Sequence, residues 1–445
     1  MTRRTLAASL RRRIPTICAC IAALAVPAGA QTTTRPATRP TTQAARYNLT
    51  AGQTPLCDTA PGLLRPAGHL RAGVEIARGL VPLNAEGQPD PAAGKIVLIA
   101  IGMSNTSYMF EGTGGLGNAE VAFMPRVKRD PSINPQLLLV NGAQPMMVTK
   151  QWRDPKDPVW TVADQRLAAA GATPRQVQVA WVKSSGAETD QAGFEAITRN
   201  IKARYPNCKL AYWSCRTFRF HLGQVQPSRD TYEEGSLVQA MIARQIQGDP
   251  TLNYDPARGP VTAPWLSWAA YLWNDGANPR SDGLVWKTPD TRGPLNGTND
   301  GHPTAKGVGK NAAQLLAFFK TDPTATPWFL RKSAPGRGPQ DVTATATPAA
   351  GPAPLTVQFS ATARDGDGRI AEYIWTYGDG TFSFNPAGDT ANLRDTLAMH
   401  NNPRPVKTFH LPGAYTAFLT VTDDAGHAVT RTVTITVTAP TSRPE

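Results

Sequence analysis

The sequence predicts an α/β domain with a parallel sheet, followed by an all-β domain. Between about residues 47 and 330, short apolar runs alternate with helix-like segments, as in a three-layer α/β/α arrangement around a doubly wound sheet. After residue 340 the pattern changes to alternating apolar and polar residues rich in Thr and Val, which is typical of an antiparallel β-sandwich. The length of 445 residues also exceeds one ordinary core, so two domains with additional tails are expected.

Residues 1–30 have the organisation of an export signal. An arginine-rich stretch precedes a short apolar run at 17–26, and small residues before Gln31 form a cleavage motif. We therefore expect a cleaved signal peptide, a secreted or periplasmic mature chain, and no stable insertion into a membrane. Residues 31–46 are mostly Thr, Arg, Pro and Ala, which predicts a disordered linker.

The composition narrows the expected partners and cofactors. The formal net charge of +13 includes five arginines of the signal region, and no helix rich in lysine and arginine follows, so nucleic acid is not an expected partner. Cys57, Cys208 and Cys215 lack metal-binding spacing, so we expect neither a metal nor another cofactor. In an oxidising compartment we expect one disulfide, which joins Cys57 to either of the other two cysteines.

The α/β domain, residues 47–332, is predicted from apolar runs and amphipathic segments. The expected strands cover 96–101, 137–140, 177–182 and 210–213, and the expected helices cover 162–170, 192–205, 236–247 and 305–319. The segment 249–297, rich in Pro, Gly and Trp, fits neither period and is interpreted as an extended loop beside the site. Residues 333–340 contain Pro, Gly and Ser and predict a linker.

The first apolar strand ends in Gly102-Met103-Ser104-Asn105. Such a continuous apolar run is typical of a strand buried on both faces of a parallel sheet, and the glycine permits a sharp turn. Open α/β sheets carry their chemistry at the carboxyl ends of the strands. Ser104 is therefore a candidate nucleophile, which needs a base, a group that orients the base, and donors for the oxyanion.

The candidate base is His302, in the motif Asn299-Asp300-Gly301-His302-Pro303 directly before the last helix of the domain. A His-Pro pair at a junction between loop and helix fixes the backbone beside the ring, and the upstream carboxylate is placed to orient the imidazole. The alternative is an ordinary turn with an exposed histidine.

Four blocks in a fixed order resemble the SGNH hydrolase superfamily. Ser104 follows the first strand, Gly142 follows the second, a Trp-containing strand lies at 180–183, and the Asp/His-Pro motif comes last. The first and third blocks are most similar to those of sialic-acid-esterase-like carbohydrate esterases. The resemblance covers roughly residues 95–319.

This resemblance implies a flavodoxin-like three-layer fold and the removal of O-acyl (acetyl) groups from carbohydrate. Ser104 would attack the ester, His302 would take its proton, and the backbone N–H groups of Ser104 and Gly142 would stabilise the oxyanion. Asn105, in the first block, would contact the substrate.

Two positions depart from the pattern of this superfamily. Asn299 stands where the superfamily has the aspartate, and the nearest carboxylate is Asp300, so either side chain, or neither, orients His302. Lys183 stands where an amide is usual, and it either donates to the oxyanion or forms a structural ion pair.

Tryptophans of the 249–297 segment are candidates for the substrate-binding rim. Trp265, Trp268 and Trp273 would either pack the loop or stack against sugar rings. Asp275, Asp282 and Asp290 in the same segment also raise the possibility of a glycosidase, which needs two facing carboxylates.

The C-terminal domain, residues 341–440, resembles the PKD (polycystic kidney disease) domain, an Ig-like β-sandwich. The motifs are Ala353–Phe359, Trp375–Gly380, Pro412–Tyr415 and Val421–Asp423. Asp365 and Asp367 either ligate calcium or form an ordinary turn. The linker before the domain predicts that few contacts cross the boundary, so that a chain cut near Gly336 folds and hydrolyses small esters.

The sequence thus predicts a secreted serine hydrolase, an esterase acting on O-acylated carbohydrate, whose PKD domain binds or tethers an extracellular polymer or protein. The alternative is a non-catalytic polysaccharide- or protein-binding protein that retains the fold. A distance above about 4 Å between Ser104 and His302 would favour that alternative. A glycosidase is the third possibility.

Overall fold

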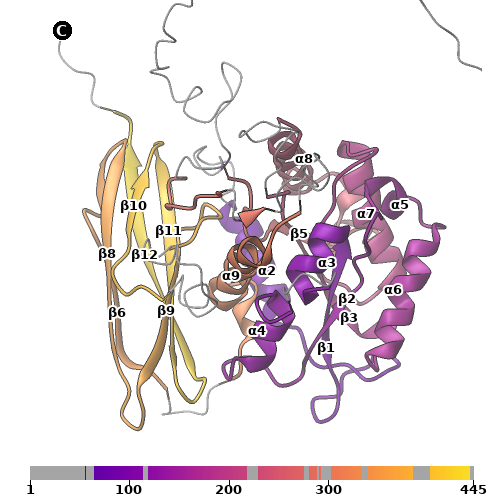
Figure 1. Cartoon of the computed structure of the whole chain (residues 1–445), viewed down its shortest axis with the longest axis horizontal. Coiled ribbons are helices and arrows are strands. Elements are labelled where there is room, and N and C mark those ends of the chain that lie inside the picture. Colours follow the sequence, from indigo (N-terminus) through magenta and orange to yellow (C-terminus); the bar gives the residue numbers. More distant parts are fainter. Residues whose placement is uncertain are drawn as a thin grey trace, which may run out of the picture. The chain divides into compact units, whose positions relative to one another are not determined.

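A five-stranded parallel sheet forms the centre of the α/β domain (Figure 1). The computed structural model describes residue 56 and residues 65–113, 119–217, 229–274, 280–287, 290–291, 302–332, 338–383 and 401–440. The strands are β1 (Ile96–Gly102), β2 (Leu137–Asn141), β3 (Val177–Lys183), β4 (Leu210–Trp213) and β5 (Trp265–Trp268), in the order β2-β1-β3-β4-β5. Every neighbouring pair is parallel. The strand order therefore reverses between β1 and β3, the position at which doubly wound sheets open a crevice.

Helices cover both faces of this sheet. One face carries α5 (Thr149–Arg153), α6 (Pro158–Ala169), α7 (Gln191–Arg204) and α8 (Arg229–Ile246). The other carries α2 (Ala67–Arg78), α3 (Ser104–Glu111), α4 (Phe123–Arg129), α9 (Ala305–Thr321) and α10 (Thr326–Phe329). Short 3₁₀ turns lie at Pro174–Gln176, Pro250–Leu252 and Pro256–Arg258. All seven residues of β1 are buried between the two helical layers, which explains its unbroken apolar sequence.

Side-chain caps fix where several helices begin. The Asp157 carboxylate accepts from the Val159 N–H at the start of α6, and the Asp190 carboxylate accepts from the Gly193 N–H at the start of α7. Thr304 is the residue before α9, and its hydroxyl accepts from the Gly307 N–H. Each cap satisfies a backbone donor that has no partner within its helix.

Two expectations for the α/β domain are wrong in detail. Helix α8 begins at Arg229 rather than at residue 236, and the segment interpreted as loop contains β5. The expected disulfide is also wrong, because Cys208 and Cys215 are both free, buried thiols, while Cys57 lies outside the described residues. Burial raises the pKa of each of the two thiols to about 12, so both are held as neutral core groups.

The C-terminal domain is a sandwich of two sheets. Its strands are β6 (Gln340–Thr347), β7 (Ala350–Pro352), β8 (Leu355–Arg364), β9 (Ile370–Thr376), β10 (Val406–Phe409), β11 (Gly413–Asp423) and β12 (Ala428–Thr438). One sheet has the order β10-β8-β6 and the other the order β7-β12-β11-β9. Between them, Phe359 packs against Trp375 and Tyr377, with ring centroids 5.1 Å apart in each pair. The alternating pattern of the sequence thus places one set of side chains in this core.

The sandwich and the α/β domain share a buried contact. Ile374 and Phe382 of the sandwich belong to the same apolar cluster as Phe318 and Phe319 of α9. The described parts of both domains lie in one compact unit. At Gly426, where φ is +85°, an added Cβ would lie 2.3 Å from the Pro131 carbonyl oxygen. The expectation that few contacts cross the boundary is therefore wrong.

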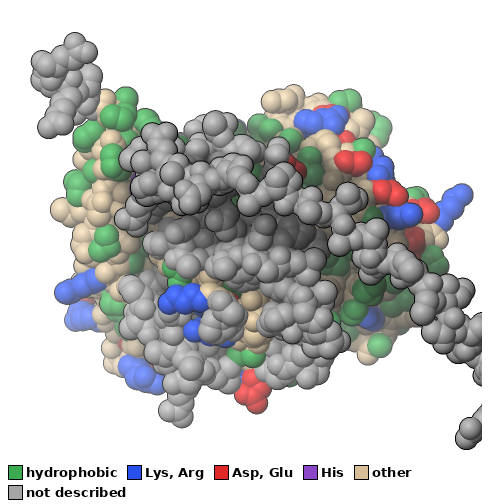
Figure 2. Space-filling model, turned by 45° about the horizontal axis from the view of Figure 1, so that its top comes forward, with side chains coloured by type: hydrophobic (Ala, Val, Ile, Leu, Met, Phe, Trp, Pro, Cys, Tyr) green, Lys and Arg blue, Asp and Glu red, His purple; other side chains and the backbone are tan. Residues whose placement is uncertain are grey.

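The surface shown in Figure 2 carries its charges in small groups. Lysine and arginine side chains there form a few small groups, and along one margin they alternate with aspartate and glutamate. Among the helices that the structure describes, none combines the length and apolar character needed to cross a bilayer.

Candidate active site

A sharp turn after β1 places Ser104 at the start of α3. Ser104 is half-buried, and Met103 before it has extended backbone angles. Gly102 has φ of +149°, and a Cβ there would lie 2.0 Å from the Lys183 carbonyl oxygen. Only glycine can therefore occupy this position beside β3.

Hydrogen bonds from neighbouring segments hold the turn. The Gly102 carbonyl accepts from the Gln144 N–H at 3.0 Å and from Trp152 Nε1 at 3.1 Å. The Thr106 hydroxyl donates to the Lys183 carbonyl at 2.6 Å. These anchors come from the segment after β2, from α5 and from α3, so Ser104 stands on a fixed support.

His302 meets Ser104 directly. The distance from Ser104 Oγ to His302 Nε2 is 2.8 Å, which is the reach required of a nucleophile and its base. Tyr108, one turn along α3, lies beside the imidazole with ring centroids 5.2 Å apart. Asp300 and Asn299, the two candidates for orienting His302, lie outside the described residues.

Backbone donors lie at the same edge of the sheet. The Thr106 and Ser107 amides make the first hydrogen bonds of α3, both to the Met103 carbonyl, so the Ser104 amide lies in the open first turn. A Cβ at Gly142 would lie 2.8 Å from the Ala100 carbonyl oxygen, so the chain passes close beside the end of β1. Ser104 and Gly142 therefore lie at the same edge of the sheet.

Asn105 lies below the surface of this edge. Its side chain is buried, and Asn105 Oδ1 has no hydrogen-bond partner among the described residues. A buried amide oxygen in this condition is costly unless a ligand or water completes it. The position is consistent with the expected contact to substrate.

Lys183, at the end of β3, is almost completely buried. Burial lowers its pKa from 10.5 to about 7; the nearby charge of Arg216 adds to the lowering, while Cys215 and Glu234 oppose it. Within the described part of the chain, no carboxylate lies within ion-pair distance of Lys183 Nζ. The described contacts therefore disfavour a structural ion pair of Lys183.

Lys183→Met is expected to stabilise the folded chain at neutral and lower pH. Folding disfavours the protonated amine, so the cost of Lys183 is full below about pH 7 and disappears near pH 10. We expect the free energy of unfolding to rise by about 2–4 kcal/mol at pH 6. Urea unfolding at pH 6 and pH 10 measures the difference, and hydrolysis by the same variant tests the oxyanion role.

The matched control for this change is Lys310→Met. Lys310 is also buried, but its Nζ lies 2.7 Å from Asp290 Oδ2, so its removal strands a buried carboxylate and should destabilise the chain. Loss of stability at pH 6 in both variants would contradict the interpretation of Lys183.

The three tryptophans do not form a sugar-binding rim, which corrects the expectation. Trp265, Trp268 and Trp273 are all buried in the two apolar clusters that flank the sheet. Trp265 stacks on His69 with centroids 4.7 Å apart, and its Nε1 donates to the His69 carbonyl. Trp265 and Trp268 pack the core because they belong to β5, a strand that helices cover, and Trp273 is buried beyond its end.

The carboxylates proposed for a glycosidase are also engaged elsewhere. Asp282 pairs with Arg280 at 2.7 Å and Asp290 pairs with Lys310, with all four side chains buried. Asp275 lies outside the described residues. Asp282 and Asp290 are therefore not free to face a substrate as a catalytic pair.

A cavity of about 790 Å³ lies at the carboxyl ends of β3 and β4. Its lining includes the polar residues Ser185, Thr189, Arg216 and Glu233. Arg216 donates to Ser185 Oγ, and Ser185 donates to the buried Glu234 carboxylate. Sequence reasoning missed this group because its members belong to separate segments that carry no motif.

The described residues contain no group of three or more His, Cys, Asp or Glu side chains that could hold a metal ion. Asp365 and Asp367, on a turn of the sandwich, therefore belong to no such group among the described residues.

Comparison with known proteins identifies the C-terminal region. Residues 340–438 match the family described as the PKD domain. Similar solved structures include the PKD1 domains of Epp from Vibrio anguillarum and of the metalloprotease PrtV from Vibrio cholerae. The match to the Epp domain is 26% identical, covers 23% of this chain and 98% of that domain, and has a TM-score of 0.17. The match to the PrtV domain is 27% identical, covers 22% of this chain and 93% of that domain, and has a TM-score of 0.16.

A structure described as carbohydrate-binding modules of the β-sandwich superfamily is 28% identical over 24% of this chain, with a TM-score of 0.19. The match spans 36% of that chain, about a third of its length. No curated protein sequence matches. The family match assigns the β-sandwich at the C-terminus: it is a PKD domain.

Proposed function

We propose that this chain is a secreted serine hydrolase that cleaves ester bonds with an SGNH-like α/β domain. The observation that carries the proposal is the distance of 2.8 Å between Ser104 Oγ and His302 Nε2. The pair stands at the carboxyl end of β1, where the strand order reverses, and this is where open sheets of this kind bind their ligands.

The geometry supports acyl transfer in two steps. His302 Nε2 takes the proton of Ser104 while Oγ attacks the ester carbonyl, and the Ser104 and Gly142 amides receive the oxyanion, with Lys183 as a further donor. The protonated imidazole then gives its proton to the departing alcohol. Water activated by the same imidazole hydrolyses the acyl-serine, and this returns Ser104 and His302 to their starting states.

The proposed substrate is an O-acylated carbohydrate, with acetyl as the leading acyl group. The resemblance of the first and third sequence blocks supports this class, and so does a PKD domain, which is typical of extracellular proteins. Trp265, Trp268 and Trp273 give no support to a carbohydrate substrate, because they are buried.

Hydrolysis of an aryl acetate by the mature chain tests the proposal. Ser104→Ala should lower the rate by at least about a thousandfold, since removal of a nucleophile from such a unit leaves only residual catalysis. Ser360→Ala, the same chemical change on the half-buried face of the sandwich, is the control and should retain full activity. Equal rates for the Ser104 variant and the unchanged chain would reject Ser104 as the nucleophile.

The second candidate is a binding protein that retains the fold without catalysis. The cavity at the carboxyl ends of β3 and β4 favours it, but the short Ser104–His302 distance favours the hydrolase. A chain that binds polysaccharide and hydrolyses none of a series of acetyl and longer acyl esters would establish the binding protein instead.

A further inference from the structure

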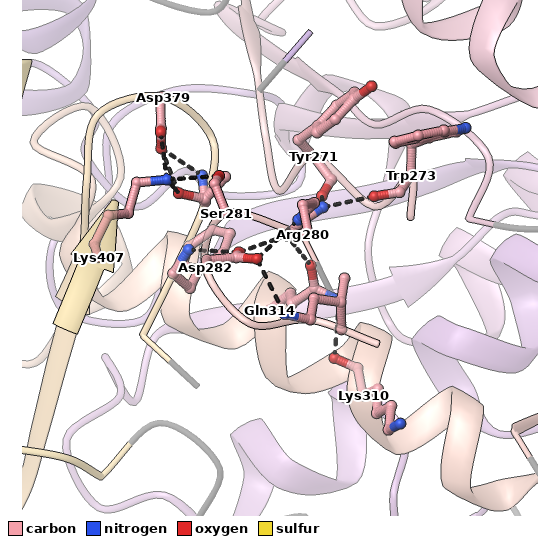
Figure 3. Close-up of polar contacts among 12 residues, drawn as sticks. Tyr271, Trp273, Arg280, Ser281, Asp282, Lys310, Gln314, Asp379 and Lys407 are labelled. Carbon is pink, nitrogen blue, oxygen red and sulfur yellow. Dashed lines mark hydrogen bonds and ion pairs between the residues drawn. The ribbon is translucent and has the colours of Figure 1, made fainter. Parts of the chain in front are cut away.

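The contact between the two domains begins at a turn of the sandwich, Tyr377–Phe382, and at Lys407 of β10. Lys407 is buried, and its Nζ lies 2.8 Å from Asp379 Oδ2 and 2.9 Å from Thr381 Oγ1. The same ammonium group donates across the boundary to Ser281 Oγ at 3.0 Å (Figure 3). One buried charge thus joins the sandwich to residues 280–287 of the α/β domain.

The next residue, Asp282, extends this connection. Its Oδ2 accepts from the Phe382 N–H of the sandwich at 3.2 Å and from the guanidinium of Arg280 at 2.7 Å. Both side chains of this ion pair are fully buried. The pKa of Asp282 is lowered: burial raises it, but the charge of Arg280 and hydrogen bonds to the carboxylate outweigh that effect.

Besides Asp282, Arg280 donates to two other segments of the α/β domain. It donates to the carbonyls of Tyr271 and Trp273 at 2.6 Å each, and to Gln314 Oε1 of α9 at 3.3 Å (Figure 3). A rigid planar guanidinium that is used in this way fixes the relative position of the groups it joins. Residues 280–287 are therefore fastened to the sandwich on one side and to α9 on the other.

The same segment leads to the turn that carries His302. Lys310 of α9 donates to Asp290 Oδ2 at 2.7 Å and to the Val285 carbonyl at 3.0 Å. The Asp290 carbonyl accepts from the Thr304 N–H at 3.0 Å, and Thr291 forms a β-bridge with Pro303. Two of these contacts fall on the residues that directly follow His302.

We infer that the PKD domain positions His302 through Lys407, Ser281 and residues 280–287 and 290–291, in addition to any binding of polymer. The inference rests on the proposed function. A base must be held within a fraction of an ångström of its nucleophile, and a small displacement costs a large part of the rate. Lys407, Asp379 and Ser281 are positioning residues that act on the reaction through the backbone before α9.

A second cross-boundary contact offers a matched comparison. Lys320, near the end of α9, is buried and forms ion pairs with Asp130 of the α/β domain at 2.7 Å and with Glu372 of β9. It stands about 22 Å along α9 from the end that follows His302. This contact holds the same two domains together without touching residues 280–291.

The test uses the full mature chain with Lys407→Met and Asp379→Asn combined, which removes the cross-boundary donor without leaving a buried unpaired charge. We expect kcat for an aryl acetate to fall about 10- to 100-fold while KM changes less than about twofold. The single variant Lys407→Arg keeps N–H donors at this position and should therefore keep most of the kcat of the unchanged chain. Glu372→Gln should lower the melting temperature to a similar extent and leave kcat unchanged.

An unchanged kcat in the double variant would overturn the inference. A loss of kcat in Glu372→Gln as large as that in the double variant would also overturn it, because both effects would then follow from domain docking in general.

A readout that does not need hydrolysis separates this inference from the proposed function. The imidazole of His302, assigned by comparison with His302→Gln, can be followed by nitrogen NMR through a pH titration. The double variant should shift the titration midpoint or tautomer signals of His302, and Glu372→Gln should not. If the unchanged chain hydrolyses no ester, the proposed function fails, but a shift of the His302 signals in the double variant still supports the positioning of His302 by the PKD domain. Unshifted His302 signals in the double variant reject that positioning.

Discussion

Replacement of His302 by alanine should abolish ester hydrolysis as completely as replacement of Ser104. The imidazole lies 2.8 Å from Ser104 Oγ, so it is placed both to take the serine proton and to return it to the leaving group. We expect kcat for an aryl acetate to fall by at least about a thousandfold. The same assay at several pH values measures the residual rate.

The double variant, Ser104→Ala with His302→Ala, gives the control for this expectation. Members of one catalytic unit are not additive, so the double variant should be no slower than either single variant. A product of the two single losses would show that the residues act independently. Separate Asp300→Ala and Asn299→Ala variants then identify the side chain that orients the imidazole.

Gly102→Ala should destabilise the chain by about 3–5 kcal/mol and sharply reduce soluble protein. The added Cβ would lie 2.0 Å from the Lys183 carbonyl oxygen, at a φ of +149° that alanine avoids. Relief of the clash would move β1 away from β3, and the hydrogen bonds that hold the Ser104 turn would break. Urea unfolding measures the loss.

Gly259→Ala is the matched control for that substitution. Gly259 also has a positive φ, +120°, but a Cβ there meets nothing within 4 Å. It therefore carries the conformational penalty alone, about 1 kcal/mol. If the two variants lose similar amounts of unfolding free energy, the close approach of β3 to Gly102 contributes little to the stability of the chain.

The central sheet could be predicted because its signals are local and strong. The run that forms β1 is apolar at almost every position, since both faces of the strand are covered. Strand β5 was missed for the opposite reason: four residues, Trp265–Trp268, are too few to show a period within a proline-rich segment. Helix α8 begins earlier than expected because polar residues such as Glu233 and Glu234 lie within its first turns rather than ahead of it.

The candidate site was predictable only where a residue belongs to a motif. Ser104 and His302 each stand beside a glycine or proline that marks a turn, and the structure brings them together. Gln144 and Trp152, which hold the Gly102 carbonyl, carry no such mark. The tryptophans were misread because an aromatic residue in a loop-like sequence gives no indication of whether it faces solvent or core.

The junction between the domains could not be predicted from the sequence. Its parts, Ser281, Asp379 and Lys407, are polar residues distant from one another, and each alone resembles an ordinary surface residue. Only the folded chain shows that Asp379 and Lys407 are buried as a pair and that Lys407 donates to Ser281.

The distance of 198 residues along the sequence between Ser104 and His302 has a consequence for biosynthesis. The nucleophile emerges from the ribosome early, whereas the base arrives only with the segment before α9. Under the proposed function, neither half of the chain could transfer an acyl group alone. A hydrolase exported in the unfolded state would therefore gain its reactivity toward esters only after the last helix had closed onto the sheet.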